Sequence, residues 1–296
     1  MGASGSSITS SRTSTSSSTS DRRPDPLRAA FAVLRLTHPF PSLLDGAVVA
    51  AVAVLAGGDA ATAARLGWSM TALQAAIGTV NDLIDAPADA GRKPGKPIPA
   101  GLISSRAARV LALAAATLGL ALTLPSGIGL LVLAVVVLAI GLAYDRWAKG
   151  TAWSWLPFAV GIPILPVYGW YGTTGALPPG FAVLLPAAVL AGAGLAIANA
   201  RVDLERDRAA GTSSVAVHLG SERSWWVSIA VLAAAAAVLI GLTPDLGALV
   251  WLGLAVTAAG ALRSWRATPI GREHGWRLQA IGVGIVGVGW VAGALT

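Results

Sequence analysis

Long apolar segments alternate with short polar ones through most of the chain after residue 25. A helix that crosses the roughly 30 Å hydrocarbon core of a bilayer needs about 20 mainly apolar residues. Nine segments are long enough to span or nearly span that core, near residues 40–58, 67–83, 107–124, 127–144, 153–172, 181–200, 225–242, 245–262 and 278–296. The second is the weakest, because Arg65, Ser69, Thr71 and Gln74 interrupt it. We therefore predict an all-α polytopic membrane protein with nine transmembrane helices.

The composition agrees with this pattern. Of the 296 residues, 55% are hydrophobic and 12% are charged, whereas a soluble domain has about 25% charged residues. The chain has no cysteine, so disulfides, thiolate chemistry and Cys-based metal sites are excluded. The three histidines, His38, His218 and His274, have no ligand spacing, and we expect no haem or zinc site.

The N-terminal region differs from the rest of the chain. Residues 1–24 are rich in Ser and Thr, and we predict a disordered tail there, followed by one transmembrane domain over 25–296. The tail has no apolar core and is not a secretory signal peptide. Its start, MGASGS, fits the loose N-myristoylation pattern, which chance explains in so Ser- and Gly-rich a segment. Residues 21–40 form a basic, amphipathic pattern typical of a helix on the membrane surface.

The positive charges predict the orientation. The formal net charge is +7, and of the 21 Lys and Arg residues only Arg65 lies in the loops that follow the odd-numbered segments. The positive-inside rule therefore places the other face in the cytoplasm, with the N-terminus inside and the C-terminus outside. We interpret the charge as a determinant of topology and expect no nucleic acid partner. We expect an integral, multi-pass protein of a bacterial or archaeal cell membrane.

Two rows of Asn and Asp residues share a four-residue spacing, at the cytoplasmic ends of the second and sixth segments. The first row is Asn81, Asp85 and Asp89, and the second is Asn199, Asp203 and Asp207. Residues four apart lie on one stripe of a helix, so each row is a line of oxygen ligands. Two facing rows would hold hard divalent cations and, through them, a diphosphate. The repeat also predicts two four-helix halves plus a ninth helix.

Basic residues accompany both rows. Asp82 adds another oxygen to the first row, which leads into a proline-rich run that favours extended backbone and carries Arg92, Lys93 and Lys96. Arg208 and the turn residue Gly211 follow the second row. Lys and Arg side chains at these positions could neutralise the phosphate charge that remains after magnesium has bound.

A third cytoplasmic element follows the fourth segment, in the run YDRWAKG. Tyr144 and Lys149 leave the membrane beside the same face. Two interpretations stay open at this point. The residues belong to the site, or Tyr144 and Trp147 are membrane-interface aromatics and Lys149 determines topology.

The two rows resemble the paired aspartate motifs of the UbiA superfamily of intramembrane prenyltransferases. The family pattern NDxxDxxxD appears as NDLIDAPAD, followed by KPGKPIPAG for KPxKPIPxG, and the second motif, DxxxD, appears as DLERD. The loop from Tyr144 to Lys149 is also a family feature. The resemblance covers most of the chain after about residue 30 and includes the nine-helix bundle.

The resemblance implies a function and a set of roles. Asn81, Asp85 and Asp89, with Asp82 beside them, would bind one Mg2+. Asp203 and Asp207, with Asn199, would bind a second. The diphosphate of a polyprenyl diphosphate would be held by basic residues, namely Arg92, Lys93, Lys96, Lys149 and Arg208. Asp85, Asp203, Tyr144 and Lys149 would be the catalytic residues. The prenyl group would pass to a small-molecule acceptor, and the lipid bilayer would surround the protein.

The acceptor stays open between two classes. The motifs resemble members that act on aromatic, quinone-precursor acceptors, and the alternative is a glycerol-phosphate lipid. Arg201 and Arg206 are available to meet an aromatic carboxylate. Asp45, inside the first segment, either lines the cavity or lies near enough to the surface to be solvated, and we favour the second.

Two functions of other classes compete with transfer. A cation-coupled transporter would place its site near the membrane midplane, whereas both rows lie at one face. A non-catalytic membrane subunit would not need all six positions of the two rows.

Overall fold

The computed structural model describes residues 1–2, 26–91, 93, 95–243 and 245–295. Residues 3–24 of the predicted tail, and Arg92, lie outside this part of the chain. Every regular element in it is helical. These are α1 (Pro26–Leu36), α2 (Pro39–Leu55), α3 (Ala60–Asp89), α4 (Ser105–Ala121), α5 (Ile128–Ala143), α6 (Leu156–Thr174), α7 (Phe181–Val202), α8 (Leu204–Ala209), α9 (Val215–Leu219), α10 (Ser221–Leu242), α11 (Ala248–Ser264) and α12 (Pro269–Ala294). A 3-10 turn (Leu124–Ser126) and a π-helical turn (Tyr144–Ala148) complete the order.

A long helix stands at each predicted apolar segment, but the count of nine spans is not confirmed. Within the described residues, five helices are long and apolar enough to cross a membrane, and a sixth span results if α1 and α2, bent by 61°, are taken together. The protein is an integral, multi-pass membrane protein. The remaining helices fall short for physical reasons: α11 has only 17 residues, while α3 and α6 carry polar, Gly and Pro residues.

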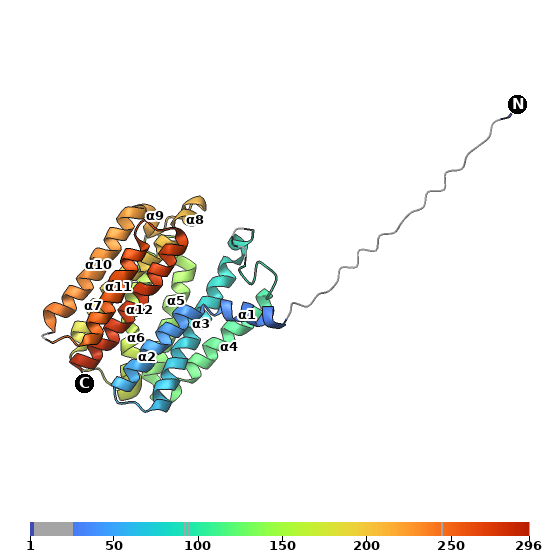
Figure 1. Ribbon diagram of the computed structural model, residues 1–296. Helices are drawn as coiled ribbons and strands as arrows, with labels where there is room; N and C mark the ends of the chain where they lie inside the picture. The colour runs from blue at the N-terminus through green and yellow to red at the C-terminus, as the bar shows by residue number, and fades with distance from the viewer. Residues whose placement is uncertain (3–25, 92, 94, 244, 296) are drawn as a thin grey trace.

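The helices form one bundle of nearly parallel rods (Figure 1). Close packing depends on glycine: a Cβ added at Gly260 of α11 would lie 2.6 Å from the Gly275 carbonyl oxygen of α12. Of the two glycines with GxxxG spacing in the last segment, Gly289 has its added Cβ 2.7 Å from Leu249, whereas Gly293 has no atom closer than 3.7 Å. Only Gly289 therefore requires the close approach that the spacing suggests.

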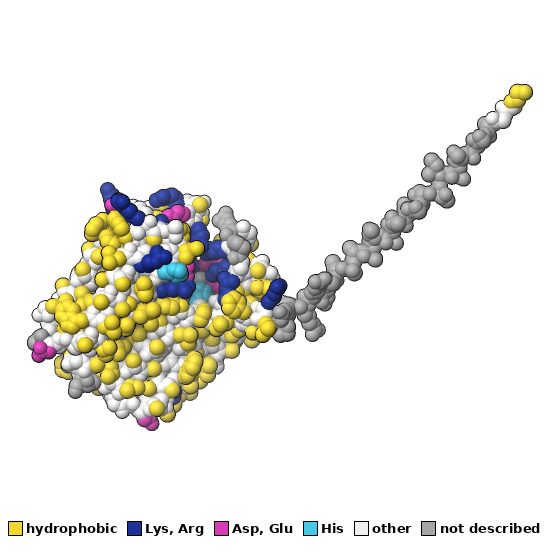
Figure 2. Space-filling view, viewed as in Figure 1, with side chains coloured by type: hydrophobic (Ala, Val, Ile, Leu, Met, Phe, Trp, Pro, Cys, Tyr) yellow, Lys and Arg dark blue, Asp and Glu magenta, His cyan; other side chains and the backbone are white. Residues whose placement is uncertain are grey.

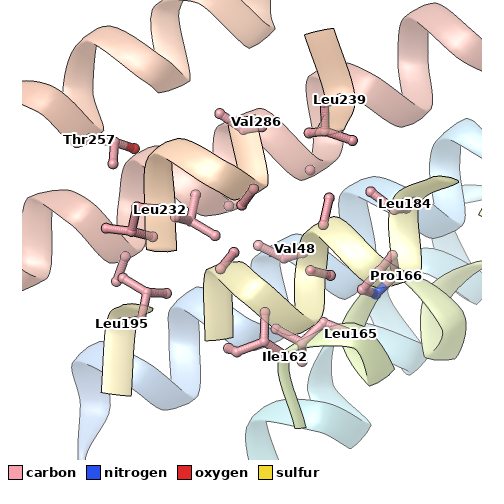
Figure 3. Close-up of a pocket in the computed structure, with 18 of the residues that line it drawn as sticks. Val48, Ile162, Leu165, Pro166, Leu184, Leu195, Leu232, Leu239, Thr257 and Val286 are labelled. Atoms are coloured by element: carbon pink, nitrogen blue, oxygen red, sulfur yellow. The ribbon is translucent and has the colours of Figure 1, made fainter. Parts of the chain in front are cut away.

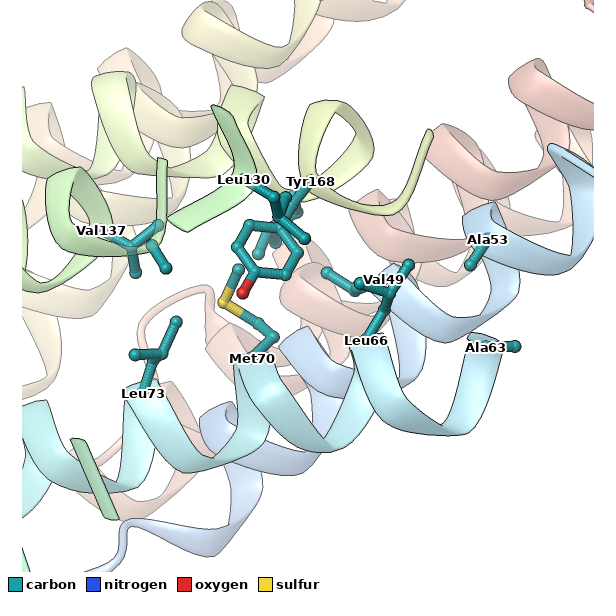
Figure 4. Packing of buried hydrophobic residues seen from close by; sticks show 11 residues of the cluster. Val49, Ala53, Ala63, Leu66, Met70, Leu73, Leu130, Val137 and Tyr168 are labelled. Carbon is teal, nitrogen blue, oxygen red and sulfur yellow. The ribbon is translucent and has the colours of Figure 1, made fainter. Parts of the chain in front are cut away.

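The polar residues that weaken the second apolar segment are paired inside the bundle. Arg65 donates to the Leu122 carbonyl at 2.7 Å and to the Ser126 hydroxyl at 2.9 Å. Ser69 lies within 2.6 Å of the Tyr168 hydroxyl and donates to the Gly119 carbonyl. Around them, Leu66, Met70 and Leu73 pack with Val49, Leu130, Val137 and Tyr168 (Figure 4). Because these hydrogen bonds replace those with water, α3 can be buried despite its modest hydropathy.

Candidate active site

The first row lies on the last turns of α3, as predicted, and each carboxylate meets a cation. Asp85 accepts a hydrogen bond from Lys149, and Asp89 pairs with Lys93 at 2.9 Å. The second oxygen of Asp89 is buried and has no hydrogen-bond partner. Asn81 donates its amide to Asp145 at 2.6 Å. The row therefore joins α3 to the turn that follows α5.

Asp82 pairs with residues outside this row. Its side chain is 3% exposed and accepts from His38 Nε2 at 2.9 Å and from Lys96. Through these two contacts, Asp82 holds Lys96 of the loop after α3 close to His38 at the start of α2. The loop folds as successive turns rather than as extended backbone, with the Ala100 amide donating to the Lys96 carbonyl at 3.0 Å. The prolines end the helix, as expected, but local hydrogen bonds close the loop.

The second row is not one continuous helix, so the prediction that residues 199–207 close the sixth helix is wrong at Asp203. Helix α7 ends at Val202, and Asp203, with φ −97° and ψ 6°, separates it from α8. The Asp207 amide still donates to the Asp203 carbonyl at 2.8 Å, which keeps the spacing of the row. Asp203 pairs with Arg206. Arg208 is exposed.

Tyr144 lies near both rows. It begins the π-helical turn after α5, its ring packs edge-on against Phe158 with centroids 5.7 Å apart, and it lies within electrostatic range of both Asp85 and Asp207. The Ser213 amide also donates to the Gly150 carbonyl at 2.9 Å, so the loops after α5 and α8 are joined. Trp147 is 73% exposed, as expected of an interfacial aromatic. For Tyr144 and Lys149, contacts with the rows favour membership of the site.

Three residues near the rows were missed in the sequence. Asp145 is 6% exposed and holds Asn81; an acid directly after a long apolar segment was the available signal. His38 offered none, because its partner Asp82 is distant in the chain. Glu205 accepts two hydrogen bonds of 2.8 Å from Arg272, which hold the pKa of its carboxyl below the usual value.

The arginines proposed for an acceptor carboxylate are already engaged. Arg201 is 3% exposed and donates to the Ser221 carbonyl at 2.8 Å and the Ser264 carbonyl at 2.9 Å. It ties α7 to α10 and α11. Because Arg206 pairs with Asp203, neither side chain stands free to receive an anionic acceptor.

The donor set fits magnesium through its chemistry. Both rows offer only oxygen ligands, which hard cations prefer, and one buried oxygen of Asp89 lacks a partner. Within the described residues, no three His, Cys, Asp or Glu side chains converge on one point. A closed cage of that kind is not required, because proteins commonly hold Mg2+ through one or two carboxylates together with substrate phosphates.

An apolar cavity lies inside the bundle (Figure 3). It is lined from six helices, α2, α6, α7, α10, α11 and α12. On α7 the lining runs from Leu184 to Leu195, one turn before Asn199. At 1.5 Å per residue this is about 17 Å, roughly half of a hydrocarbon core. The cavity can therefore take a long apolar chain whose head lies near the second row.

Asp45 lines this cavity, so the preference for a surface position is wrong. On the face seen in Figure 2, basic, acidic and His side chains gather at the end of the bundle that carries α8, α9 and the loop after α3. The fold and site together define a helical membrane protein with an ionic site at one end and an apolar cavity within.

The chain belongs to the UbiA prenyltransferase family, whose model matches residues 43–278. The matched residues cover most of the chain. Chlorophyll synthase of rice (Oryza sativa subsp. japonica) is 33% identical over 165 residues, which cover 52% of this chain and 44% of that protein. The chain thus matches less than half the length of the plant enzyme. Digeranylgeranylglyceryl phosphate synthase of Methanoregula boonei is 29% identical over 218 residues, covering 71% and 75% of the two chains.

Solved structures share the fold. A UbiA homolog from Archaeoglobus fulgidus bound to DMAPP and Mg2+ aligns with a TM-score of 0.64 and 20% identity, covering 86% of this chain and 98% of that chain. At this identity the likeness supports the all-helical architecture alone. The expected family is confirmed, and the expected link to quinone synthesis is not.

Proposed function

We propose that this chain transfers a polyprenyl group from a polyprenyl diphosphate to a small acceptor molecule, with Mg2+ as cofactor, at the cytoplasmic face of a bacterial or archaeal membrane. One observation carries the proposal. Two oxygen-bearing rows, flanked by basic residues and both near Tyr144, lie at the end of a bundle with an apolar cavity in its interior.

The two ends of the substrate have opposite needs, and the protein offers both. The diphosphate requires cations, for which Lys93, Lys149 and Arg208 are placed at the rows. The prenyl tail requires apolar surface, which the cavity walls provide. Burial of the tail excludes water that would otherwise capture the allylic cation.

Metal ligands are assigned from the two rows. Asn81, Asp85 and Asp89 would hold one ion, and Asn199, Asp203 and Asp207 another. When bound, Mg2+ supplies charge stabilisation to the departing diphosphate. As the bond between the allylic carbon and the diphosphate oxygen breaks, its electron pair leaves with the diphosphate. The acceptor then bonds to that carbon and releases a proton to the diphosphate or to water. Tyr144 would assist at the diphosphate or beside the allylic cation.

Asp82 and Lys96 pair with each other rather than standing free for a ligand. The sequence predicts Asp82 as a metal ligand and Lys96 as a diphosphate ligand, and both roles remain predictions. Their mutual pair, together with His38, favours a role in holding the loop that carries Lys93.

Two classes of acceptor are candidates. The motifs favour an aromatic quinone precursor. A glycerol-phosphate lipid is the second candidate, favoured by the similarity to the Methanoregula boonei synthase over 75% of its length.

An acceptor screen tests the function. Membranes containing the protein would receive labelled geranylgeranyl diphosphate, Mg2+ and a panel of aromatic and glycerol-phosphate acceptors. We expect a prenylated product that disappears with a chelator and returns when Mg2+ is restored. Product formation that resists chelation would refute the metal assignment, and absence of product with every acceptor would refute the transfer.

A further inference from the structure

Asp45 is an acidic side chain in an otherwise apolar cavity. Of the residues that line it, only Asp45 and Thr257 have polar side chains. Thr257 is already satisfied, because its hydroxyl donates to the Gly253 carbonyl at 2.8 Å. Asp45 therefore provides the polar contact that this wall offers to a bound molecule.

The carboxyl group of Asp45 has one committed oxygen and one uncommitted oxygen. Oδ2 accepts a hydrogen bond from the Gln74 amide at 2.7 Å. Oδ1 accepts none from any described residue. A carboxylate oxygen beside apolar surface gains free energy from a hydrogen-bond donor, because desolvation without a partner is costly.

Asp45 and Gln74 are both set back from the ionic site by the same distance. Asp45 lies seven residues along α2 from His38, and Gln74 lies seven residues before Asn81 on α3. At 1.5 Å per residue, Asp45 is about 10 Å along α2 from His38, which pairs with Asp82, and Gln74 is about 10 Å along α3 from Asn81. A molecule whose reacting atom lies at the ionic site could therefore place a second polar group at Asp45.

Small residues close the contact between α2 and α3 beside this pair. A Cβ added at Gly46 would lie 2.7 Å from the Gly67 carbonyl oxygen, and one at Gly67 would lie 2.9 Å from Ala50. The close approach of the two backbones therefore rests on glycine rather than on the acidic group.

We propose that Asp45, oriented by Gln74, binds a hydroxyl group of the acceptor and disfavours acceptors that present a carboxylate there. The inference rests on the proposed function and narrows its substrate class to hydroxyl-bearing acceptors that are neutral at this position. A hydroxyl can donate to Oδ1, whereas a second anion beside the carboxylate would be repelled at low dielectric. An aromatic or a lipid acceptor meets this requirement if it carries a second hydroxyl about 10 Å from its reacting atom.

The test uses matched acceptors and four variants of the full-length protein. The acceptors are para-(hydroxyhexyl)phenol against para-(carboxypentyl)phenol, and octanediol against hydroxyoctanoate, with labelled geranylgeranyl diphosphate and Mg2+. Within each pair the reacting hydroxyl or phenol is the same, and only the distant polar group differs. The two pairs separate an aromatic acceptor from an aliphatic one. The variants are Asp45→Leu, Asp45→Asn, Gln74→Leu and the control Thr173→Val, which lies on α6 outside the cavity lining and donates to the Gly169 carbonyl at 2.9 Å.

We expect wild type to prefer the hydroxyl member of at least one pair. Asp45→Leu should raise the KM for that acceptor about tenfold and leave the KM for the diphosphate unchanged. Asp45→Asn removes the negative charge of the side chain. It should therefore reduce the preference for the hydroxyl acceptor over its carboxylate counterpart. Gln74→Leu should shift the acceptor KM less than Asp45→Leu, and Thr173→Val should leave it unchanged.

Equal use of the hydroxyl and carboxylate members by wild type would overturn the proposal, as would identical effects of Asp45→Leu and Gln74→Leu. If Asp45→Leu does not fold, Asp45→Asn decides. Calorimetric binding of para-(hydroxyhexyl)phenol and para-(carboxypentyl)phenol to the purified protein needs no turnover. Tighter binding of the hydroxyhexyl compound, lost in Asp45→Asn, supports the site even if prenyl transfer fails, whereas equal binding of the two compounds refutes it.

Discussion

At the scale of single residues, the site is a set of carboxylates paired with cations. Asp85 meets Lys149, Asp89 meets Lys93, and Asp203 meets Arg206. Such pairs keep charge tolerable at the end of a membrane bundle. They also place ammonium groups beside the oxygens that would bind a metal, where phosphate oxygens would arrive. Mutation of a carboxylate that binds metal should lower turnover, whereas mutation of one that holds the loop should lower stability.

The metal ligands should be essential for turnover and dispensable for folding. In Asp85→Asn and Asp203→Asn we expect prenyl transfer to fall at least about 100-fold, because charge stabilisation of the leaving group is lost. The thermal unfolding midpoint should change little. Transfer of labelled prenyl groups in membranes measures turnover, and thermal unfolding of the purified protein measures the midpoint. Asp245→Asn, at an exposed loop residue, is the control. Near-normal turnover in either variant would contradict the assignment.

Asp82 should behave in the opposite way. In Asp82→Ala, Lys96 and His38 lose their buried partner, and we expect a stability loss of about 1–3 kcal/mol. Lys96→Ala should cost a similar amount, and the double variant little more, because both changes remove one interaction. Chemical unfolding of the purified variants measures this. Additive losses would show that Asp82 and Lys96 act independently.

At the scale of elements, the close contact of α6 and α7 positions the chemistry. A Cβ added at Gly192 of α7 would lie 2.3 Å from the Phe158 carbonyl oxygen of α6. The Phe158 ring in turn packs against Tyr144. The separation of two helices is therefore coupled to the residue that lies between the two rows.

Gly192→Ala should displace α7 from α6, because backbone atoms cannot move aside as a flexible side chain can. We expect a stability loss of about 1–3 kcal/mol and a reduced kcat for prenyl transfer. Thermal unfolding and turnover of the purified protein measure both. The matched control is Gly241→Ala in α10, where an added Cβ meets no atom within 4 Å. Equal stability of the two variants would rule out the tight contact.

At the scale of the whole molecule, two kinds of evidence give different numbers of membrane spans. Hydropathy and helix length together select five or six spans in the described residues. The charge of the loops agrees with nine crossings. The difference arises at α2, α3, α6 and α11, which are short or carry polar groups satisfied by neighbouring helices. A helix whose polar side chains are paired inside a bundle can cross a bilayer that its isolated sequence would not enter.

Reporter fusions decide between these counts. We expect fusions after Gly175 and after Thr296 to report an extracytoplasmic location, and a fusion after Gly211 to report the cytoplasm, because nine spans follow the positive-inside rule. Alkaline phosphatase and a fluorescent protein would serve as paired reporters. A cytoplasmic signal after Thr296 would refute the nine-span topology.

The sequence by itself determined the helices, their order and the positions of the two rows along the chain. These features are local: an apolar run, a four-residue spacing or a proline acts over a few residues. Tertiary structure decided the partners. The pairing of Asp82 with His38, the contact of Asn81 with Asp145, and the engagement of Arg201 join residues far apart in the chain. Asp45 turns into the cavity rather than toward the surface because packing of α2 on α3 orients that face of the helix. Helix periodicity fixes which residues share a face, but only packing against other helices selects what that face meets.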